Sequence, residues 1–406
     1  MKGPLDPDAG AGLDRVIGLA HCHLGLDVAY LAELTSEGHV YRAIAGDLSS
    51  FGMAAVDGPP AEVAFCRLLL AGEIPNVVRD AGAHERAAGL AITRQARIGA
   101  FIGVPVRLSD GTPYGVLCGL SHTPDHTLDE RDVRFMSMLG ELIVGDLDEQ
   151  RTRERLHADL TEVLETEGLV VAYQPIVELD SERCLGIEAL ARFPKQFGPP
   201  NVALAAAETV GLSLELERLV VRKAWEMLPL LSPEQFLALN VSPDALVELA
   251  RRANLRDDLP LAQIVVEITE HAAVESYAAL HGELAPLRKA GLRIAVDDAG
   301  AGYASLRHVL ELRPDFIKVD RSLIHGIAND HARRVAASAF LSLALDIGST
   351  VVAEGVERPA DLVAIRELGM HAVQGYLLGK PSTKHSTVMR WIGAPAQDRQ
   401  RVLSGA

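Results

Sequence analysis

The chain has 406 residues, which corresponds to two or three domains of ordinary size. Acidic residues outnumber basic ones by 55 to 39, giving a formal net charge of −16, and apolar residues make up 48%. The acidic balance argues against sequence-independent binding to DNA or RNA, which requires basic side chains that displace counterions. The apolar fraction argues against intrinsic disorder. We therefore expect a globular protein with no nucleic-acid polymer as partner.

The four cysteines are scattered and form no CxxC pair. They are Cys22, Cys66, Cys118 and Cys184. A chain of this length with so few cysteines does not indicate a disulfide framework, and a reducing, cytoplasmic setting fits them best. The first residues lack the apolar stretch of a signal peptide. The most apolar helical stretch, residues 335–345, is too short to span a bilayer. We expect a soluble, cytoplasmic protein without a membrane partner.

Residues 1–145 have the pattern of a small mixed α/β domain. Two apolar runs, 102–106 and 114–120, flank an Asp110-Gly111 pair, which predicts a β-hairpin. The segment from Thr127 to Glu130 matches a capping box, so we expect a helix to begin with Thr127 as its N-cap. Apolar residues at helical spacing follow as far as residue 143.

Residues 146–167 predict a helical linker between two domains. The first nine of these residues are nearly all polar and good helix formers. Leu156, Leu160 and Val163 then restore an apolar seam before Gly168, which is typical of a helix end. Two interpretations stay open, a solvated surface helix and a dimer-forming signalling helix. The seam is shorter than the three or four heptads that a coiled coil needs.

Residues 168–406 alternate short β-rich runs with helical patterns. The expected strands are 170–176, 185–193, 236–240, 264–268, 292–296, 315–319, 350–353 and 372–374. The expected helices between them are 214–228, 242–254, 274–290, 330–345 and 359–368. This alternation predicts an α/β fold, a (β/α)8 barrel of the TIM type. The connection at 177–184 is too short for a crossover helix, so we expect the first strand to be antiparallel.

Each expected strand carries a polar side chain at or near its end. These residues are Gln174, Glu188, Asn240, Glu267, Asp297 with Asp298, Lys318 with Asp320, Glu354 and Gln374. In a barrel such ends converge on one face, where active sites lie. Five carboxylates near one axis repel one another unless cations or protons bind. Oxygen ligands, the Asn240 amide included, favour Mg²⁺, Mn²⁺ or Ca²⁺ over Zn²⁺.

The adjacent Asp297 and Asp298 suit two metal ions that share a carboxylate. Two such ions activate water and stabilise an in-line displacement at phosphorus. Lys318 belongs to the same ring and is a candidate to orient or deprotonate that water. Arg192, four residues after Glu188, is a candidate phosphate clamp. The set predicts metal-dependent hydrolysis of a phosphoester.

The segment Glu188-Ala189-Leu190, followed by Ala191-Arg192-Phe193, resembles the signature of EAL domains, the bacterial cyclic-di-GMP phosphodiesterases. Further motifs agree with that family in order: Tyr-Gln-Pro-Ile at 173–176, Leu-Asn-Val-Ser at 239–242, Glu-Ile-Thr-Glu at 267–270, Asp-Asp at 297–298, Ile-Lys-Val-Asp at 317–320, Ala-Glu-Gly-Val-Glu at 353–357 and Gln-Gly-Tyr at 374–376. The resemblance covers nearly all of residues 168–385. It implies hydrolysis of cyclic-di-GMP to linear pGpG.

The resemblance also implies a role for each motif residue. The implied metal ligands are Glu188, Asn240, Glu267, Asp297, Asp298 and Glu354, which would hold two Mg²⁺ or Mn²⁺ ions. The implied catalytic residues are Lys318, which would contact the attacking water, with Glu354, Asp298 and Glu188. The implied substrate-binding residues are Gln174, Leu190, Arg192, Asp320 and Gln374. Glu270 would anchor the loop after Asp298, and a homodimer is implied.

The loop after Asp298 departs from the family pattern Asp-Asp-Phe-Gly-Thr-Gly-Tyr-Ser-Ser, because Ala299 and Ala301 replace the Phe and Thr. In the family this loop links the metal site to the dimer face. The departure keeps open an alternative, a catalytically weak or inactive cyclic-di-GMP receptor that signals to a partner. A purely scaffolding role leaves the carboxylates unexplained. A dinucleotide-binding turn at 300–302 lacks the third glycine that such a turn requires.

Residues 1–145 resemble GAF domains, a family of small sensory α/β folds. The resemblance rests on the patterns at 75–78 and 98–106, the Asp110-Gly111 hairpin and the closing helix. Haem, a cyclic nucleotide or no ligand at all stay open. Cys66 is followed by Arg67, where bilin-binding relatives commonly carry His, so we interpret Cys66 as a buried structural cysteine. We expect this domain to regulate the barrel through residues 146–167.

Overall fold

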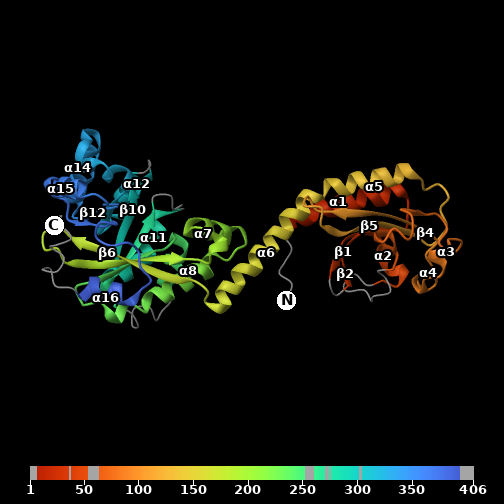
Figure 1. Ribbon diagram of the computed structural model, residues 1–406, viewed down its shortest axis with the longest axis horizontal. Coiled ribbons are helices and arrows are strands. Elements are labelled where there is room, and N and C mark those ends of the chain that lie inside the picture. The colour runs from red at the N-terminus through yellow and green to blue at the C-terminus, as the bar shows by residue number, and fades with distance from the viewer. Residues whose placement is uncertain are drawn as a thin grey trace. The chain divides into compact units, whose positions relative to one another are not determined.

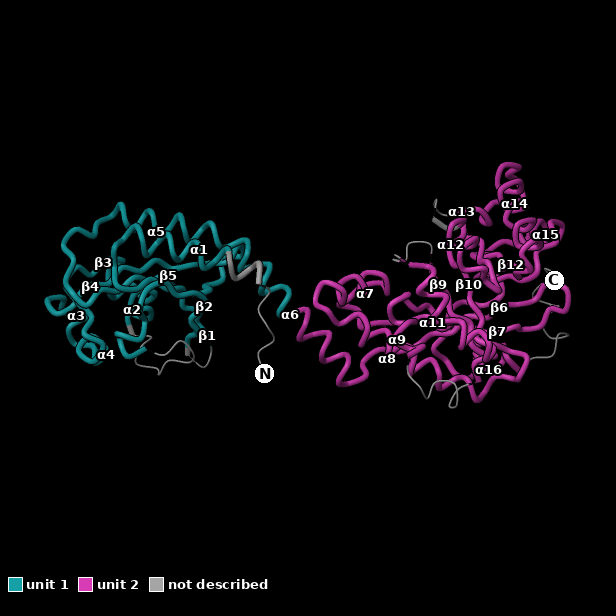
Figure 2. Tube along the Cα trace, turned by 180° about the vertical axis from the view of Figure 1, so that it is seen from behind, with its two compact units in different colours: residues 1–155 teal, residues 156–406 magenta. Residues whose placement is uncertain are grey.

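The computed structural model describes residues 7–393 except 36–37, 54–63, 252–259, 270–273, 275 and 301–303. The chain divides into two compact units, residues 1–155 and 156–406 (Figure 2). The division falls inside helix α6 (Val144–Thr166), which occupies the segment expected to be a helical linker. The expected domain boundaries at 145 and 168 stay predictions. No described helix combines the length and the apolar character that crossing a bilayer requires.

The N-terminal unit is built on a five-stranded antiparallel sheet with the strand order β2-β1-β5-β4-β3. Its strands are β1 (Val28–Thr35), β2 (Gly38–Gly46), β3 (Val77–Val78), β4 (Ala100–Arg107) and β5 (Pro113–Ser121). Helices α1 (Pro7–Leu24) and α5 (Glu130–Leu142) cover one face (Figure 1). The other face packs against α2 (Ala64–Leu70), α3 (Glu85–Ala88), α4 (Ala91–Gln95) and the 3-10 turn η1 (Leu48–Phe51).

Alternation along the strands divides the apolar side chains between two cores. Tyr30 and Phe101 belong to the core beneath α2, whereas Leu31 and Ile102 belong to the core beneath α1 and α5. Successive strand side chains point to opposite faces, so one strand supplies both cores. The strands are apolar on both faces because helices cover both faces of the sheet.

The hairpin at Asp110-Gly111 is confirmed, but the capping box at Thr127 is wrong. β4 and β5 pair antiparallel around Gly111, whose φ of 82° suits glycine. Helix α5 begins at Glu130 with Asp129 as its N-cap. Asp132 closes the box by accepting the N–H of Asp129 at 2.9 Å. The Thr127 hydroxyl donates instead to Asp125, so it does not cap the helix.

The C-terminal unit is a closed barrel of eight strands. They are β6 (Val170–Glu178), β7 (Cys184–Arg192), β8 (Phe236–Asn240), β9 (Ile264–Thr269), β10 (Arg293–Ala299), β11 (Phe316–Val319), β12 (Thr350–Ala353) and β13 (Ala372–Val373). Strand β6 is antiparallel to both of its neighbours, β7 and β13. All other neighbours pair parallel. The modified barrel with an antiparallel first strand is therefore confirmed.

Helices surround this barrel (Figure 1). They are α7 (Pro200–Thr209), α8 (Ser213–Trp225), α9 (Pro243–Arg251), α11 (Tyr277–Lys289), α12 (Ala304–Leu312), α13 (Arg321–Ile324), α14 (His331–Ile347), α15 (Pro359–Leu368) and α16 (His385–Gly393). One apolar core joins the helices to the outer faces of the strands. A second, smaller cluster fills the barrel interior and includes Ile176, Phe236 and Phe316. Arg293 lies over the rings of Phe236 and Phe316.

Helix α6 ends one residue earlier than the glycine pattern indicates. The last helical residue is Thr166, and Glu167 takes the left-handed conformation with φ 51°. Gly168 donates its N–H to the Val163 carbonyl at 2.9 Å. The carboxylate of Glu167 pairs with Arg222 at 2.7 Å. The left-handed residue at the end of the helix is therefore a glutamate rather than the glycine that follows it.

Candidate active site

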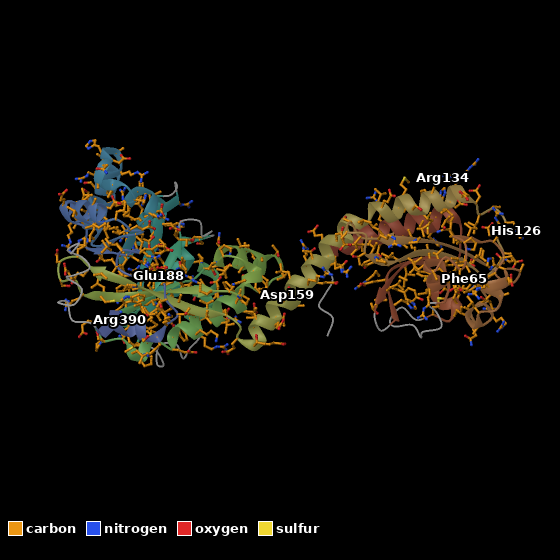
Figure 3. The ribbon with its side chains drawn as sticks, viewed as in Figure 1. Phe65, His126, Arg134, Asp159, Glu188 and Arg390 are labelled. Carbon is orange, nitrogen blue, oxygen red and sulfur yellow. The ribbon has the colours of Figure 1, made fainter. Side chains whose placement is uncertain are left out.

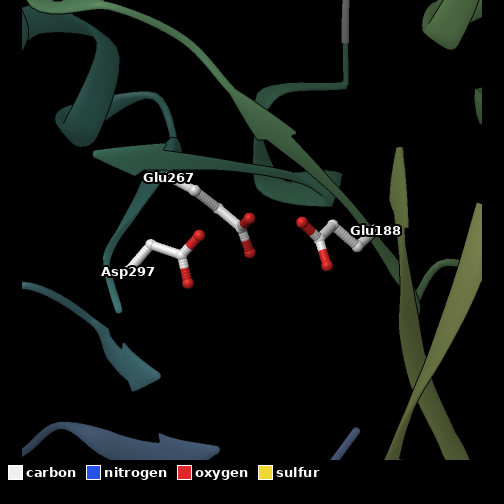
Figure 4. Close-up of side chains that lie close together, drawn as sticks. All are labelled: Glu188, Glu267 and Asp297. Carbon is white, nitrogen blue, oxygen red and sulfur yellow. The ribbon is translucent and has the colours of Figure 1, made fainter. Parts of the chain in front are cut away.

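Strand register brings the expected polar residues to one end of the barrel interior. Gln174 on β6 lies opposite Glu188 on β7, and Asn240 on β8 lies opposite Glu267 on β9. Paired residues of neighbouring strands share a face of the sheet, so their side chains meet. Glu188 lies among the barrel strands in Figure 3. Figure 4 shows its carboxylate facing those of Glu267 and Asp297.

Lys318, on β11, stands at the centre of these carboxylates. It is only 1% exposed. Its Nζ lies 2.9 Å from oxygens of Glu267, Asp297 and Glu354, and 3.6 Å from Glu188. The ammonium donates a hydrogen bond to Glu267 Oε2 and forms ion pairs with the other three carboxylates, while Asp297 Oδ1 is buried without a hydrogen-bond partner among the described residues. The lysine fixes the spacing of the carboxylates around it.

One lysine faces four carboxylates, so it does not neutralise the cluster. Burial opposes the charged form of Lys318, but Asp297, Glu188, Glu267 and Glu354 together raise its pKa well above the usual value. Burial and the charge of Glu188 raise the pKa of Glu267 well above its usual value. Burial and Asp297 do the same for Glu354. Excess negative charge of this kind is relieved by bound protons or cations.

Glu188 is the exception, because its environment favours the charged form. Burial acts to raise its pKa, but the Lys318 charge and hydrogen bonds from Gln374 and Asn240 lower it below the usual value. Gln374 donates to Glu188 Oε2 at 2.5 Å, and Asn240 donates to Oε1 at 2.9 Å. The residues around Glu188 therefore keep it as an oriented anion.

Two groups of three carboxylates have the spacing of metal ligands, and they share Asp297. Glu188, Glu267 and Asp297 form one group, and Asp297, Asp298 and Glu354 form the other. In each group one oxygen from every residue lies within 4.8 Å of the others. Oxygen-only sets of this kind suit Mg²⁺, Mn²⁺ or Ca²⁺. The donor set thus fits divalent cations, as expected.

The backbone at Asp298 explains how two successive residues reach one cluster. Successive side chains of a regular strand point to opposite faces. Asp298 has φ 55°, a conformation that non-glycine residues seldom adopt. Such strain persists where the surrounding structure enforces it, commonly at functional sites. The turn at Asp298 brings its carboxylate within reach of Asp297 and Glu354.

Asn240 presents its carbonyl oxygen rather than its amide hydrogens. The side-chain N–H groups go to Glu188 at 2.9 Å and to Glu267 at 3.2 Å. The residue is exposed, in contrast to both carboxylates. Its Oδ1 is the polar atom left to face a ligand.

Two of the residues expected to bind substrate are buried beside Glu188. Gln374 is 3% exposed and donates to Gln174 Oε1 at 3.3 Å as well as to Glu188. Gln174 is 7% exposed and donates to the Gly379 carbonyl at 2.9 Å. The Gln374 Oε1 atom is buried without a hydrogen-bond partner among the described residues. Their contact with substrate stays a prediction, while their support of Glu188 is structural.

Three further expected site residues are described in the structure. Arg192 donates to the carbonyl of Ala191 at 2.8 Å, and Leu190 is half-buried nearby on β7. Asp320 caps helix α13 by accepting the N–H of Ser322 at 2.8 Å. Their roles toward a substrate stay predictions.

Part of the loop after Asp298 falls outside the described residues. Glu270 and Ala301 both lie in undescribed segments, so their expected roles stay predictions. Ala299 is described and is fully buried in the barrel core. Its carbonyl accepts the N–H of Asp320 at 3.1 Å.

The loop after Glu354 is held by a residue that the sequence analysis did not single out. Gly355 has φ 64°, and a Cβ atom there would lie 2.4 Å from Cγ of Arg321. The Arg321 guanidinium pairs with Glu357 at 3.1 Å. Arg321 follows β11, and Gly355 and Glu357 follow β12. The arginine therefore connects the loop after β11 to the loop after β12. Its position directly after Asp320 was the available signal.

The model of the EAL domain family matches residues 157–381, more than half of the chain. The chain belongs to the EAL domain family. The model of the GAF domain family matches residues 12–144. The α/β barrel and the GAF-like unit therefore agree with the resemblances found in the motifs.

Two curated relatives share this barrel region. The bifunctional diguanylate cyclase/cyclic di-GMP phosphodiesterase MucR of Pseudomonas aeruginosa is 30% identical over 300 residues, which are 71% of this chain and 43% of that protein. The probable cyclic di-GMP phosphodiesterase PdeN of Escherichia coli is 31% identical over 255 residues, 60% of this chain and 49% of that protein. The chain thus spans less than half the length of either relative.

Solved EAL structures have the same fold. The PaMucR phosphodiesterase in complex with c-di-GMP superposes with a TM-score of 0.50 at 30% identity, covering 58% of this chain and 99% of that chain. The Xanthomonas citri FimX EAL domain in complex with c-diGMP gives 0.51 at 21% identity, covering 59% and 98%. The second comparison concerns the fold alone.

Proposed function

We propose that the barrel hydrolyses cyclic-di-GMP to linear pGpG with the help of two divalent cations, Mg²⁺ or Mn²⁺. The observation that carries this proposal is the pair of three-carboxylate groups that share Asp297 around buried Lys318. Membership of the EAL family supports it. So do the relatives named cyclic di-GMP phosphodiesterases and the neighbour solved with c-di-GMP.

The proposed roles follow from where each side chain lies. The ligands of the cations are Glu188, Asn240, Glu267, Asp297, Asp298 and Glu354. Bound cations would supply an activated water and neutralise charge that develops on the phosphate. Lys318 holds three carboxylate oxygens at 2.9 Å, so the ligands keep their spacing against mutual repulsion. Gln374 keeps Glu188 oriented.

The substrate would lie across the open side of the cluster, where Asn240 is exposed. In the proposal Arg192 binds a phosphate, as a guanidinium group does well. Gln174, Leu190, Asp320 and Gln374 complete the substrate contacts, and Glu270 anchors the loop after Asp298.

We further propose that the GAF-like unit regulates hydrolysis through α6, in a cytoplasmic homodimer. Helix α6 contains residues of both compact units, so a change in one unit has a continuous path to the other. Such regulation requires two states of different activity whose balance a ligand shifts.

A receptor that binds cyclic-di-GMP without cleaving it is the second candidate. The observation that favours it is Ala299, a fully buried small residue directly after the Asp pair. Binding without turnover would distinguish this candidate.

Product analysis tests the proposal. The full chain is incubated with cyclic-di-GMP and Mg²⁺, Mn²⁺ or chelator, and the products are separated by ion-pair chromatography. We expect pGpG with either metal and none with chelator. Glu188→Gln should abolish product, whereas Glu208→Gln, at an exposed glutamate on α7, should not. Binding without product would support the receptor instead.

A further inference from the structure

We propose that Glu217, on helix α8, is a positioning residue for the ligand Asn240. This inference rests on the proposed metal site and adds a supporting group to it. Glu217 lies in the sequence Glu215-Leu216-Glu217-Arg218 on the barrel's outer layer. Among the described residues it forms no hydrogen bond or ion pair with the carboxylate cluster or with a residue expected to bind substrate.

The contact that carries the inference is a hydrogen bond to the loop after β8. The Glu217 carboxylate accepts the backbone N–H of Ser242 at 2.8 Å. Ser242 follows Asn240 by two residues and opens helix α9. Its hydroxyl oxygen accepts from the N–H of Ala245 at 3.2 Å, and its carbonyl accepts from Leu246 at 2.9 Å. Glu217 therefore holds Ser242, which lies between strand β8 and helix α9.

Asn240 lies between two fixed points. On one side β8 pairs with β9, where Asn240 is in register with Glu267, and Val241 donates to the Glu267 carbonyl at 3.2 Å. On the other side the Glu217–Ser242 hydrogen bond holds the chain. Without that acceptor the Ser242 N–H loses its partner, and the path from Asn240 into α9 is fixed at one side only.

Asn240 differs from the carboxylates in that its side chain is restrained only by its hydrogen bonds to Glu188 and Glu267 among the described contacts. Glu188, Glu267 and Asp297 are buried and are restrained by Lys318. Asn240 is exposed. Groups hydrogen-bonded directly to a metal ligand typically contribute a factor of about 10 to 100 in metal affinity. Glu217 acts through the backbone of Ser242 instead, so we expect an effect at the lower end of that range.

A structural role in helix packing is the competing explanation, and the chain offers a matched control for it. Arg218, the next residue on α8, forms an ion pair with Glu248 on α9. Its removal loosens the contact between α8 and α9 but leaves the Ser242 hydrogen bond in place. If Glu217 only supports helix packing, substitutions of Glu217 and of Arg218 should lower metal affinity equally. If Glu217 positions Asn240, only substitutions of Glu217 should lower it.

The test measures Mn²⁺ binding to the full chain by the loss of the free-ion signal in electron paramagnetic resonance, with no substrate present. The variants are Glu217→Ala, Glu217→Leu, Glu217→Gln and Arg218→Ala. Leu fills the space without accepting a hydrogen bond, so it guards against misfolding of the Ala variant. Gln keeps an acceptor oxygen.

We expect Glu217→Ala and Glu217→Leu to weaken Mn²⁺ binding about tenfold, and Glu217→Gln and Arg218→Ala to stay near the wild type. Wild-type affinity in Glu217→Leu would overturn the positioning role, and so would equal losses at Glu217 and Arg218. A wild-type chain that binds no Mn²⁺ would overturn the proposed metal site itself, which separates the two failures.

Discussion

The two units bury titratable groups in opposite ways. Tyr30 and Cys118 lie in the N-terminal core, where burial first and the neighbouring thiols next raise the pKa of both groups well above the usual values. They therefore stay neutral. In the barrel, burial also raises the pKa of Glu267 and Glu354, but it is outweighed at Glu188, where Lys318 lowers the pKa, and at Lys318, where the carboxylates raise it. Burial alone thus does not decide protonation; the partners within a few ångströms do.

This difference separates a packing core from a chemical site. The Cys66 and Cys118 sulfurs lie 3.6 Å apart among aromatic and aliphatic side chains. Among the described residues, no group of three potential ligands forms in this unit. The barrel interior buries ionisable side chains that hydrophobic packing does not require. Retaining them costs stability, which supports a functional reason for their presence.

The largest expected effect comes from the shared ligand. Asp297→Asn should lower pGpG production by at least about a hundredfold. The loss of a metal ligand should have a larger effect than the loss of a group that only orients a ligand. The substitution should lower the melting temperature less than the loss of Lys318 does, because Lys318 keeps three other carboxylate partners. Rate assays and thermal unfolding on the same samples check both parts. Turnover near the wild type would remove Asp297 from the metal site.

Loss of the central lysine tests charge compensation directly. Lys318→Met leaves buried carboxylates without their counter-charge, and breaking a buried pair typically costs about 3–5 kcal/mol. Urea unfolding should show this loss, and millimolar Mn²⁺ should recover part of it. Unchanged stability would mean that Lys318 does not compensate the charge of the carboxylates around it.

Asp361, at the start of α15, extends the comparison to a group with no part in the chemistry. Burial opposes its charge, but Arg358 at 2.8 Å and the N–H groups of Gly326 and Ala328 at 3.2 Å lower its pKa to about 2 from 3.8. A lowered folded-state pKa adds stability above about pH 4, which disappears as the pH falls towards 2.

Asp361→Asn should therefore cost about 2 kcal/mol at neutral pH and almost nothing near pH 2, by linkage. Urea unfolding as a function of pH checks this. Asp346→Asn, at an exposed aspartate on α14, is the control and should change little. A cost of Asp361→Asn that stays constant with pH would show that the carboxylate charge is not what matters.

The smallest expected effect concerns the thiols. Iodoacetamide should modify Cys22 in the folded chain, because Cys22 is exposed and the other three cysteines are buried. Intact mass should show one adduct before unfolding and four in denaturant. Rapid labelling of Cys66 or Cys118 without denaturant would show that the N-terminal core opens, and would weaken its description as a closed packing core.

The sequence was sufficient for the barrel and the ring of carboxylates, because parallel strands end on one face and polar residues followed the strands. Glu188, Glu267 and Asp297 meet for that reason. The N-cap Asp129 was missed because Thr127 fits the same capping pattern. The hydrogen bond from the Thr127 hydroxyl to Asp125, which excludes Thr127 as the cap, is visible only in the structure.

Contacts between distant segments were beyond the sequence. The expected substrate contact of Gln374 stays a prediction, but its hydrogen bond to Glu188, which the closing of the barrel by β13 makes possible, was not expected. Glu217 sits on a helix whose polar positions give no sign of which one contacts a loop. Contacts of this kind depend on how the helices pack over the strands, and the local sequence pattern contains no information about this packing.

The central claim is that the two carboxylate groups joined by Asp297 hold cations. Crystals of the full chain grown with Mn²⁺ and measured for anomalous scattering test it most directly. We expect one peak among Glu188, Glu267 and Asp297 and a second among Asp297, Asp298 and Glu354. No peak in the barrel at saturating Mn²⁺, or peaks only at surface acids, would contradict it.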